Sequence, residues 1–367
     1  MSLYIASAGS LVNHDSPDVR SWASIYHLLA MNVSLVDRAG IVSVPFKFEI
    51  YKPFEFSRIK QADSLTYEEC CDRRARELLA LQDRLGVPIA LLYSGGIDST
   101  LVLVSFAKVL SPAQLKERVH VYMSNDSILE NPGFYYNFVR KNCNIRASEN
   151  FTTILDGRHI MVGGEHNDQL LGSDLIGKIA RQYPFEIVHR PYTRAFLTEF
   201  FVSKGLTQAG ADHWFDILDM HIKSAGAPVS TVFQFFWWLN FIFKWQSVYF
   251  RILLRVEKSH RSTITQKFCE HYYHHFYSAD YFQRWSMDNP DLKIKDSWAS
   301  YKFVAKDLIY AFNKDQDYRD NKLKIGSLWR LFLQKDTAVG LNANFDYLDS
   351  LEVPTLYNPD NSFKFAS

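Results

Sequence analysis

The chain has 367 residues, of which 47% are hydrophobic and 22% charged, and its formal net charge is +1. That length accommodates one large or two ordinary domains, and the composition is that of a globular protein. The near-zero net charge excludes a global electrostatic field that would draw the chain to nucleic acid or to a membrane surface, so we expect neither as a partner.

The cysteines and the N-terminus indicate a cytoplasmic protein. The four cysteines are few and scattered, and no CxxC pair is present, which argues against a cysteine zinc site and suits a reducing compartment. The first residues carry no basic leader, so we expect a strand there instead of a signal peptide. Cys70 and Cys71 fall in an expected helix, where burial of at least one is favoured over redox chemistry.

Residues 1–62 are expected to form a small β-rich region. Between Ile41 and Tyr51 the apolar residues recur with a period of two, which is typical of a half-buried strand. From Ser64 to Leu85 the spacing becomes helical, and Ser64 or Thr66, followed by a glutamate, is the expected N-cap.

Strand-like and helix-like segments alternate after Val87. The pattern predicts strands at 89–93, 119–123 and 160–162, and helices at 99–110, from 111 onward and at 134–141. Such alternation predicts an α/β fold with a doubly wound parallel sheet, whose ligands bind at the carboxyl ends of the strands.

Helical periodicity dominates after about residue 175. The apolar run 232–243 is interrupted by Gln234 and Asn240 and is shorter than the roughly 20 residues of a membrane span, so it is expected to be a buried core helix. We expect one domain over residues 63–350 and a loose tail over 351–367.

The most informative segment is the first loop, residues 94–99, with the sequence Ser-Gly-Gly-Ile-Asp-Ser. It follows an apolar strand and precedes an apolar helix. Gly95 and Gly96 let the backbone approach a ligand closely, and the amides of a first helical turn favour an anion. Asp98 beside a phosphate requires a bridging cation, which Mg²⁺ supplies. A plain glycine turn capped by Ser94 or Asp98 is the alternative; a Walker loop is excluded because its Gly-Lys-Ser/Thr ending is absent.

A second acidic loop follows the expected strand at 160–162. Its sequence from Gly163 is Gly-Gly-Glu-His-Asn-Asp. Glu165 and Asp168 are three residues apart, so both can face one point across a helical turn. Near a phosphate they indicate Mg²⁺ or a base directed at an amine, and the alternative is an acidic cap on a helix.

Together the two loops resemble the synthetase domain of asparagine synthetases, β-lactam synthetases and lasso-peptide cyclases, in the ATP pyrophosphatase superfamily. The resemblance implies an adenine nucleotide alpha hydrolase-like fold that uses ATP and Mg²⁺ to adenylate a carboxylate, release pyrophosphate and form an amide. It assigns Mg²⁺ to Asp98 and Asp168, and the incoming amine to Glu165. The nucleotide contacts that we expect are at Leu92, Ser94, Gly95, Gly96, Asp98, Ser99, Thr100, Met123 and Gly164.

A weaker match lies near the C-terminus. Residues 301–306 and 318–326 resemble the family's lysine-bearing helix and its later Arg-x-x-Lys turn. The resemblance implies that a late lysine contacts the α-phosphate and pyrophosphate, with Lys322 the first choice and Lys324 the second. A solvated basic turn is the alternative.

Departures from the family pattern leave the substrates open. Ser2 stands where the family's glutaminase has its cysteine nucleophile, so we expect no glutamine hydrolysis. Nitrogen would come from ammonia, a substrate amine or a separate ammonia-supplying protein, and the acid would be a small-molecule or peptide carboxylate. His166 and Asn167 replace the family's usual small residues, which leaves the identity of the substrate open.

Two other function classes are weighed against the ligase. A nucleobase- or tRNA-modifying enzyme of the 7-cyano-7-deazaguanine synthase or tRNA-thiolation type is disfavoured, because Cys269 alone lies beyond the second loop. A non-catalytic nucleotide-binding protein is the other. His271 and His275, four apart on an expected helix face, form a candidate metal pair, although surface or interface aromatics are the favoured interpretation.

Overall fold

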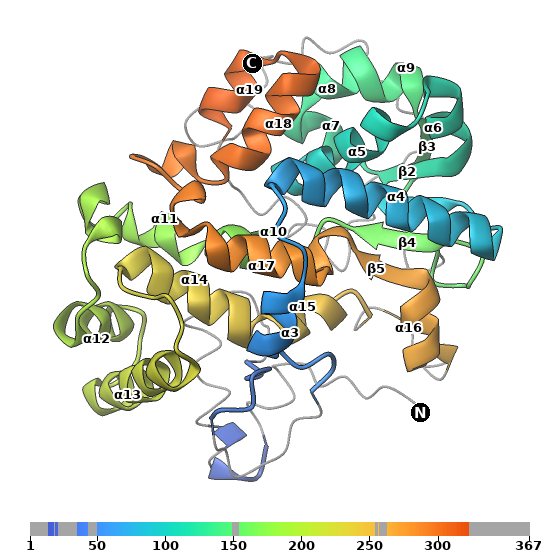
Figure 1. Cartoon of the computed structure of the whole chain (residues 1–367). Helices are drawn as coiled ribbons and strands as arrows, with labels where there is room; N and C mark the ends of the chain where they lie inside the picture. Colours follow the sequence, from blue (N-terminus) through green and yellow to red (C-terminus); the bar gives the residue numbers. More distant parts are fainter. Residues whose placement is uncertain are drawn as a thin grey trace.

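The computed structural model describes residues 14–17, 19–20, 35–42, 50–148, 154–253, 256 and 263–322. A five-stranded sheet, with strand order β3-β2-β1-β4-β5 and every pair parallel, lies within the α-helical remainder (Figure 1). The strands are β1 (Ile89–Leu92), β2 (Val119–Met123), β3 (Asn144–Ala147), β4 (Ile160–Gly163) and β5 (Tyr273–His275). The predicted α/β architecture with a parallel sheet is confirmed, and the order is compatible with a Rossmann-like fold.

Both faces of the sheet are covered by apolar side chains. Because successive strand residues point to opposite faces, Ile89 and Leu91 of β1 belong to the large cluster that includes helix α5 (Ile97–Val109). Ala90 and Met161 point the other way and join a second cluster with the segment around Phe250. The sheet is therefore a central layer between two apolar cores.

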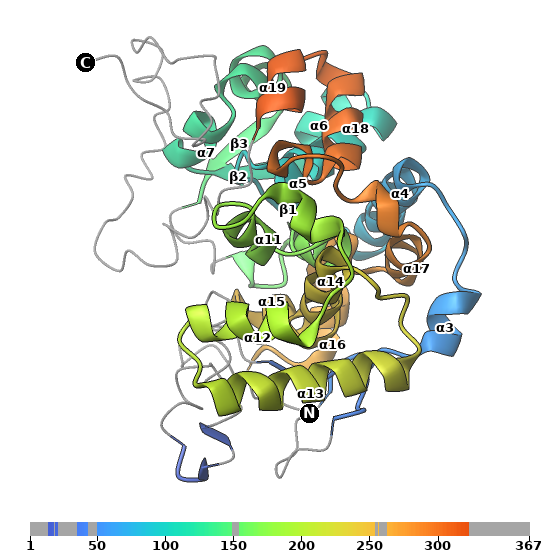
Figure 2. The same ribbon diagram turned by 90° about the vertical axis from the view of Figure 1, so that its left-hand side faces the viewer.

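The helices occupy most of the remaining described chain. They are α3 (Phe56–Gln61), α4 (Tyr67–Leu85), α5 (Ile97–Val109), α6 (Pro112–Arg118), α7 (Asn125–Glu130), α8 (Pro132–Phe134), α9 (Arg140–Asn142), α10 (Asn167–Leu171), α11 (Leu175–Ile179), α12 (Arg194–Ser203), α13 (Gln208–Ala225), α14 (Val232–Phe243), α15 (Trp245–Phe250), α16 (Gln266–Tyr272), α17 (Asp280–Asp288), α18 (Phe303–Asn313) and α19 (Gln316–Asn321). In both ribbon views α18 and α19 lie near α5, and α12 and α13 lie away from the sheet (Figures 1 and 2).

Local sequence accounts for several helix boundaries. Thr66 and Glu69 form a reciprocal capping box at the start of α4, and Gly86 ends that helix with a left-handed φ of +67°. Ser111 caps α6 in the same way, with Pro112 as its first residue. The helix predicted from Ser64 to Leu85 is therefore confirmed, with Thr66 as its cap.

Helix α14 is a core element. Every residue from Val232 to Phe243 except Gln234 is buried, as predicted for this apolar run. Trp237 and Phe241, one turn apart, stack with ring centroids 5.3 Å apart. Within the part of the chain that the structure describes, no helix has both the length and the apolar character that crossing a membrane requires.

The C-terminal half differs from expectation at β5. Residues 273–275 extend the sheet beside β4, so α16 ends at Tyr272 and His275 lies in a strand. The prediction that His271 and His275 share a helix face is wrong, and His275 is fully buried, not at a surface. Strand β3 was also not predicted, and the helix expected at 134–141 is mostly a π-helix over Tyr135–Val139.

Some predictions fall on residues outside the described ranges. The strand expected between Ile41 and Tyr51 lies mostly in 43–49, and Lys324 and the tail also lie outside. The described parts of residues 1–62 contain α3 and turns.

Candidate functional site

The two predicted loops meet where the strand order reverses. The chain proceeds from β1 outward through β2 to β3, then returns to β4 on the other side of β1. In open α/β sheets such a switch point leaves a crevice at the carboxyl ends of the two central strands. Gly164, just after β4, packs against the start of α5: a Cβ atom there would lie 3.1 Å from the Ser99 amide nitrogen. The first and second loops therefore touch at the expected ligand position of the fold.

The first loop is a rigid glycine turn. Gly95 has a φ of +75°, and a Cβ atom there would clash with the Ser127 carbonyl oxygen. The Ser94 amide donates to Ser99 Oγ over 3.1 Å, and Thr100 Oγ1 donates to the Gly95 carbonyl over 3.3 Å. The conformation and the close approach both require glycine at position 95.

No side chain caps the start of α5. Gly96 is the N-cap residue and supplies no side-chain acceptor, so neither Ser94 nor Asp98 caps the helix. The first-turn amides of a helix have no intrahelical partner, and an uncapped turn directs them and the helix dipole at whatever anion lies there. This geometry favours the anion-binding interpretation of the loop over the alternative of a plain glycine turn capped by Ser94 or Asp98.

Asp98 and Asp168 share one internal cation. Lys302 Nζ lies 2.6 and 2.7 Å from the two carboxylate oxygens of Asp98 and 2.6 Å from Asp168 Oδ1. The Lys302 side chain is fully buried, while the two carboxylates are 18% and 25% exposed. The two acids to which the family resemblance assigned Mg²⁺ are thus joined by one lysine that contacts both.

Further polar contacts fix Asp98. Asn167 Nδ2 donates to Asp98 Oδ1 over 2.7 Å, and the Tyr277 hydroxyl donates to the Asp98 carbonyl over 2.9 Å. The Tyr67 hydroxyl in turn donates to Asn167 Oδ1, and burial raises the Tyr67 pKa well above its usual value, which keeps this phenol a donor. Asn167, a departure from the family pattern, is therefore a positioning residue for Asp98.

Glu165 has its own cation. Arg251 Nη2 lies 2.5 Å from both carboxylate oxygens of Glu165, and Arg251 Nε lies 3.2 Å from Oε1. Burial acts to lower the pKa of Arg251, but the charge and hydrogen bonds of Glu165 outweigh it and the pKa is raised. Glu165 must release this guanidinium before it can accept a proton, so the paired form is not a ready general base.

His166 is a packing residue of the second loop. It has a left-handed φ of +75°, is buried, and stacks on Trp245 with ring centroids 4.0 Å apart. Its Nε2 lies 3.0 Å from the Trp245 carbonyl oxygen, to which it donates. Burial, together with the nearby His275, holds the pKa of His166 well below its usual value, so the ring is neutral near pH 7. It anchors the loop that carries Glu165.

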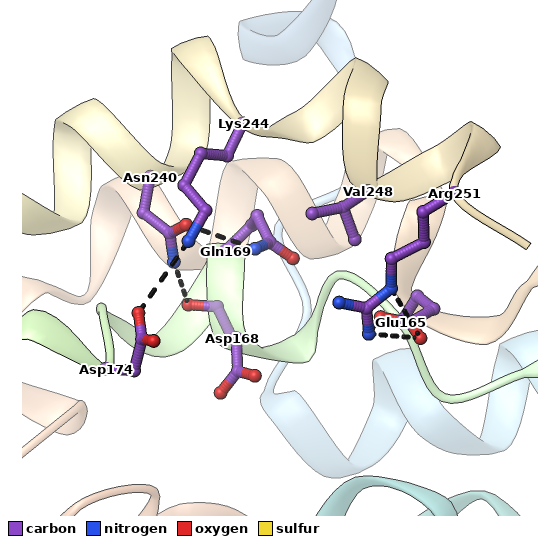
Figure 3. Close-up of a pocket in the computed structure, with 8 residues that line it drawn as sticks. All are labelled: Glu165, Asp168, Gln169, Asp174, Asn240, Lys244, Val248 and Arg251. Atoms are coloured by element: carbon purple, nitrogen blue, oxygen red, sulfur yellow. Dashed lines mark hydrogen bonds and ion pairs between the residues drawn. The ribbon is translucent and has the colours of Figure 1, made fainter. Parts of the chain in front are cut away.

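A polar pocket opens beside these acids (Figure 3). It lies between the second loop with α10 and the helices α14 and α15, and its cavity volume is about 20 Å³. Arg251 lies over Glu165, Lys244 reaches toward Asp174 at 3.7 Å, and the Asp168 carboxylate points away from both cations. The lining residues are Glu165, Asp168, Gln169, Asp174, Asn240, Lys244, Val248 and Arg251.

Lys322 lies behind the first loop. Its Nζ is 2.6 Å from Glu130 Oε1 and 2.9 Å from the Glu130 carbonyl oxygen. A Cβ atom on Gly95 would lie 2.9 Å from Glu130 Cβ, so the ion pair borders the glycine turn. Lys322 is 1% exposed, which contradicts the alternative of a solvated basic turn.

Leu92 and Met123 end β1 and β2 at the same sheet edge. Met123 is fully buried, and its carbonyl accepts a hydrogen bond of 3.0 Å from the Ser148 amide. Leu92 is partly buried against the second apolar cluster. Ser124, next in the chain, is the N-cap of α7. The side chains of Leu92 and Met123 pack in the interior, so the nucleotide contacts predicted at these two residues could be made only by their backbone.

Sequence reasoning missed Arg251 and the dual contact of Lys302. Arg251 lies 86 residues from Glu165 and carries no local motif. Lys302 stands in the quoted segment 301–306, but nothing in its neighbours indicates that it would join both loops.

The two acids fit a metal ion that is shared with phosphates. Mg²⁺ in nucleotide sites is commonly held by one or two carboxylates together with substrate oxygens, and Asp98 and Asp168 supply two. Among the described residues no group of three or more His, Cys, Asp or Glu side chains could hold a metal ion. The donor set therefore suits a cation that arrives with its own anionic partner.

Comparison with known proteins adds no relative to this geometry. No protein-family model, no curated protein and no solved structure matches the chain. The family resemblance of the two loops stays a prediction, and function rests on the site itself.

Proposed function

We propose that this protein is an ATP-dependent ligase that adenylates a carboxylate, releases pyrophosphate and forms an amide with ammonia or an amine. The observation that carries the proposal is the contact of the glycine turn with the Asp98–Lys302–Asp168 cluster at the β1–β4 switch point. A helix N-terminus favours a bound anion, whereas two carboxylates beside it favour a cation. Both preferences are met if a cation and phosphate groups bind there together. The adenine nucleotide alpha hydrolase-like subclass of the fold belongs to this proposal.

The chain's residues divide the work by charge. The first loop would receive the β- and γ-phosphates on its amides and on Ser94 and Ser99. Asp98 and Asp168 would hold Mg²⁺, which supplies charge neutralisation and orientation when bound. Lys302 and Lys322 would add positive charge near the leaving group, and electrostatic stabilisation of this kind is usually the largest single contribution to the rate.

The adjoining pocket supports a place for the acid substrate. A carboxylate oxygen attacks the α-phosphorus as the bond to the bridging oxygen breaks, and pyrophosphate leaves. An amine nitrogen then attacks the acyl-adenylate carbonyl, loses a proton and expels AMP. Arg251 and Lys244 offer positive charge to the carboxylate, and Glu165 would take the amine's proton after releasing Arg251.

One observation favours a non-catalytic nucleotide-binding protein as the second candidate. Each of the three predicted acids is paired with a lysine or arginine of the same chain. A protein that only binds a nucleotide would keep the turn and hold its acids in such pairs. The nucleobase- and tRNA-modifying candidates have less support, because all four cysteines are buried as free thiols.

Product analysis tests the proposal. Purified full-length protein is incubated with ATP, Mg²⁺ and a panel of carboxylic acids and amines, and nucleotides and condensation products are read by mass spectrometry. We expect AMP and pyrophosphate together with an amide, and far less of all three with Asp98→Asn. ADP and orthophosphate as main products would contradict the ligase, and ATP binding without turnover across the panel would favour the second candidate.

A further inference from the structure

Lys302 occupies the space between the two carboxylates that are proposed to hold Mg²⁺. Its Nζ is within 2.7 Å of both oxygens of Asp98 and within 2.6 Å of one oxygen of Asp168. The lysine side chain is fully buried, so water screens these contacts much less than it would at the surface. A cation that is part of the protein therefore already neutralises one of the two negative charges.

The backbone of Lys302 is held in place. Its φ is +63°, its amide donates to the Lys293 carbonyl over 3.0 Å, and its carbonyl accepts from Ala305 at the start of α18. A left-handed conformation at a residue other than glycine persists where the surroundings over-determine it, and such residues cluster at functional sites. Rotation of the long side chain is therefore the way in which the ammonium can leave its carboxylates.

A divalent cation and this ammonium compete for the same oxygens. Mg²⁺ bound to either carboxylate would lie directly beside Nζ, and repulsion between the two positive charges is strong where solvent is scarce. Two carboxylates cannot balance three positive charges. Phosphate groups would change this balance, because they add negative charge and give the ammonium another acceptor.

We propose that Lys302 excludes divalent cations from Asp98 and Asp168 until a nucleotide supplies phosphate oxygens, to which its ammonium then moves. The proposal rests on the proposed function for the identity of the nucleotide, whereas the exclusion depends on three side chains of this chain. Metal and nucleotide then bind with positive coupling, because each makes the other's site available.

The test measures Mn²⁺ binding to the nucleotide-free, full-length protein, with free Mn²⁺ counted by electron paramagnetic resonance. Wild-type protein should bind no Mn²⁺ at submillimolar concentrations. Lys302→Met removes the charge and keeps the chain length, and binding should tighten at least tenfold. Mg²⁺ should displace the bound ion, and the double variant Lys302→Met/Asp98→Asn should lose the gain.

Lys306 provides a matched control. It lies one turn further along α18 and is also buried, but its ammonium donates to the Ala299 carbonyl over 2.7 Å. Lys306→Met should leave Mn²⁺ binding at the wild-type level. Equal Mn²⁺ affinity in the wild type, Lys302→Met and Lys306→Met would overturn the proposal, as would tight binding to the wild type without nucleotide.

Without Lys302, the charges of Asp98 and Asp168 repel one another and could prevent folding. A second variant therefore tests the same proposal. Lys302→Gln keeps a hydrogen-bond donor, and Mg²⁺ should raise its melting temperature but not that of the nucleotide-free wild type, since a ligand that binds the folded state stabilises it. If neither variant folds, the wild type decides. Mn²⁺ binding only in the presence of α,β-methylene-ATP supports the exclusion, and binding without it contradicts the exclusion.

The outcome is separable from that of the proposed function. If the wild type forms no AMP with any substrate, but Lys302→Met binds Mn²⁺ and the wild type does not, the proposed exclusion of metal by Lys302 is supported and the proposed ligase function is contradicted. If the wild type forms AMP, but Lys302→Met binds Mn²⁺ no better than the wild type does, the proposed ligase function is supported and the proposed exclusion is contradicted.

Discussion

Two acids on the second loop, three residues apart, are neutralised in different ways. Glu165 binds the guanidinium of Arg251 with both of its carboxylate oxygens. Asp168 shares its lysine with Asp98, so one ammonium joins the two loops. In the bidentate pair, both carboxylate oxygens of Glu165 are occupied by one guanidinium. The ammonium shared by Asp98 and Asp168 can instead be replaced by another cation without separating the two acids. Glu165 and Asp168 therefore have different counter-ions although they lie on the same loop, and we expect them to have different roles.

The largest expected effect tests the shared cluster. Asp98→Asn removes one charge while Asn167, Tyr277 and Lys302 still contact position 98, so the fold should persist. AMP formation should fall by about 10²–10³-fold, the usual cost of removing one preorganised electrostatic group. Initial rates over a Mg²⁺ series measure it, with circular dichroism as the folding control. Wild-type rates at low Mg²⁺ would remove Asp98 from the metal site.

The next prediction separates the two acids by half-reaction. Asp168→Ala should lose ATP–pyrophosphate exchange and product together, because phosphate charge is left uncompensated. Glu165→Gln should keep exchange and lose the amide, since a carboxamide fills the same space but accepts no proton from the amine. If both variants lose exchange equally, Glu165 belongs with the phosphates and the comparison fails.

Removing Arg251 from its ion pair with Glu165 should lower the stability of the protein more than it lowers the rate of adenylation. Arg251→Met leaves the Glu165 carboxylate without its guanidinium contacts, and we expect a loss of about 2 kcal/mol in the free energy of unfolding. The value is below the range for fully buried pairs because 26% of the Arg251 side chain is exposed. Urea denaturation measures it. The double variant Glu165→Gln/Arg251→Met should recover part of the loss, and purely additive losses would show that the pair is uncoupled.

The smallest effect concerns Lys306, a buried cation whose ammonium donates to a backbone carbonyl. Burial, with the charge of Lys322 adding to it, lowers the pKa of Lys306 to about 8. A folded-state pKa below the unfolded one destabilises the protein at neutral pH, and stability returns as the pH rises between the two values. We expect the wild type to gain about 1–2 kcal/mol relative to Lys306→Met between pH 8 and 9.5. Parallel urea titrations at the two pH values measure the difference, and an unchanged gap would contradict the assignment.

Much of the central fold was predictable because its signals are local. Strands β1, β2 and β4, the capping boxes of α4 and α6, and the buried helix α14 each follow from the residues of a single segment. β3 and β5 were not predictable, because they are short and are defined by pairing with β2 and β4. Tertiary pairing therefore overrode the helical spacing between His271 and His275.

The same division holds for the site. The geometry of the first loop was predictable from local sequence, because Gly95 permits a left-handed turn and a close backbone approach, and the following helix fixes the direction of the amides. The counter-ions of the acids come from α18 and from the end of α15, far along the chain, and no sequence spacing relates them to the loops. Charged groups are common on any helix, so their pairing had to be seen in three dimensions.

The late position of Lys302 in the chain has a consequence for biogenesis. During synthesis β1, α5, β4 and the second loop are made before Lys302, so Asp98 and Asp168 exist before their shared ammonium does. Two like charges near one another oppose the docking of the loops. The arrival of Lys302 at the start of α18 relieves that opposition, which couples closure of the sheet's central crevice to that segment. A ribosome-bound intermediate would thus keep this crevice loose until the helix that completes it has emerged.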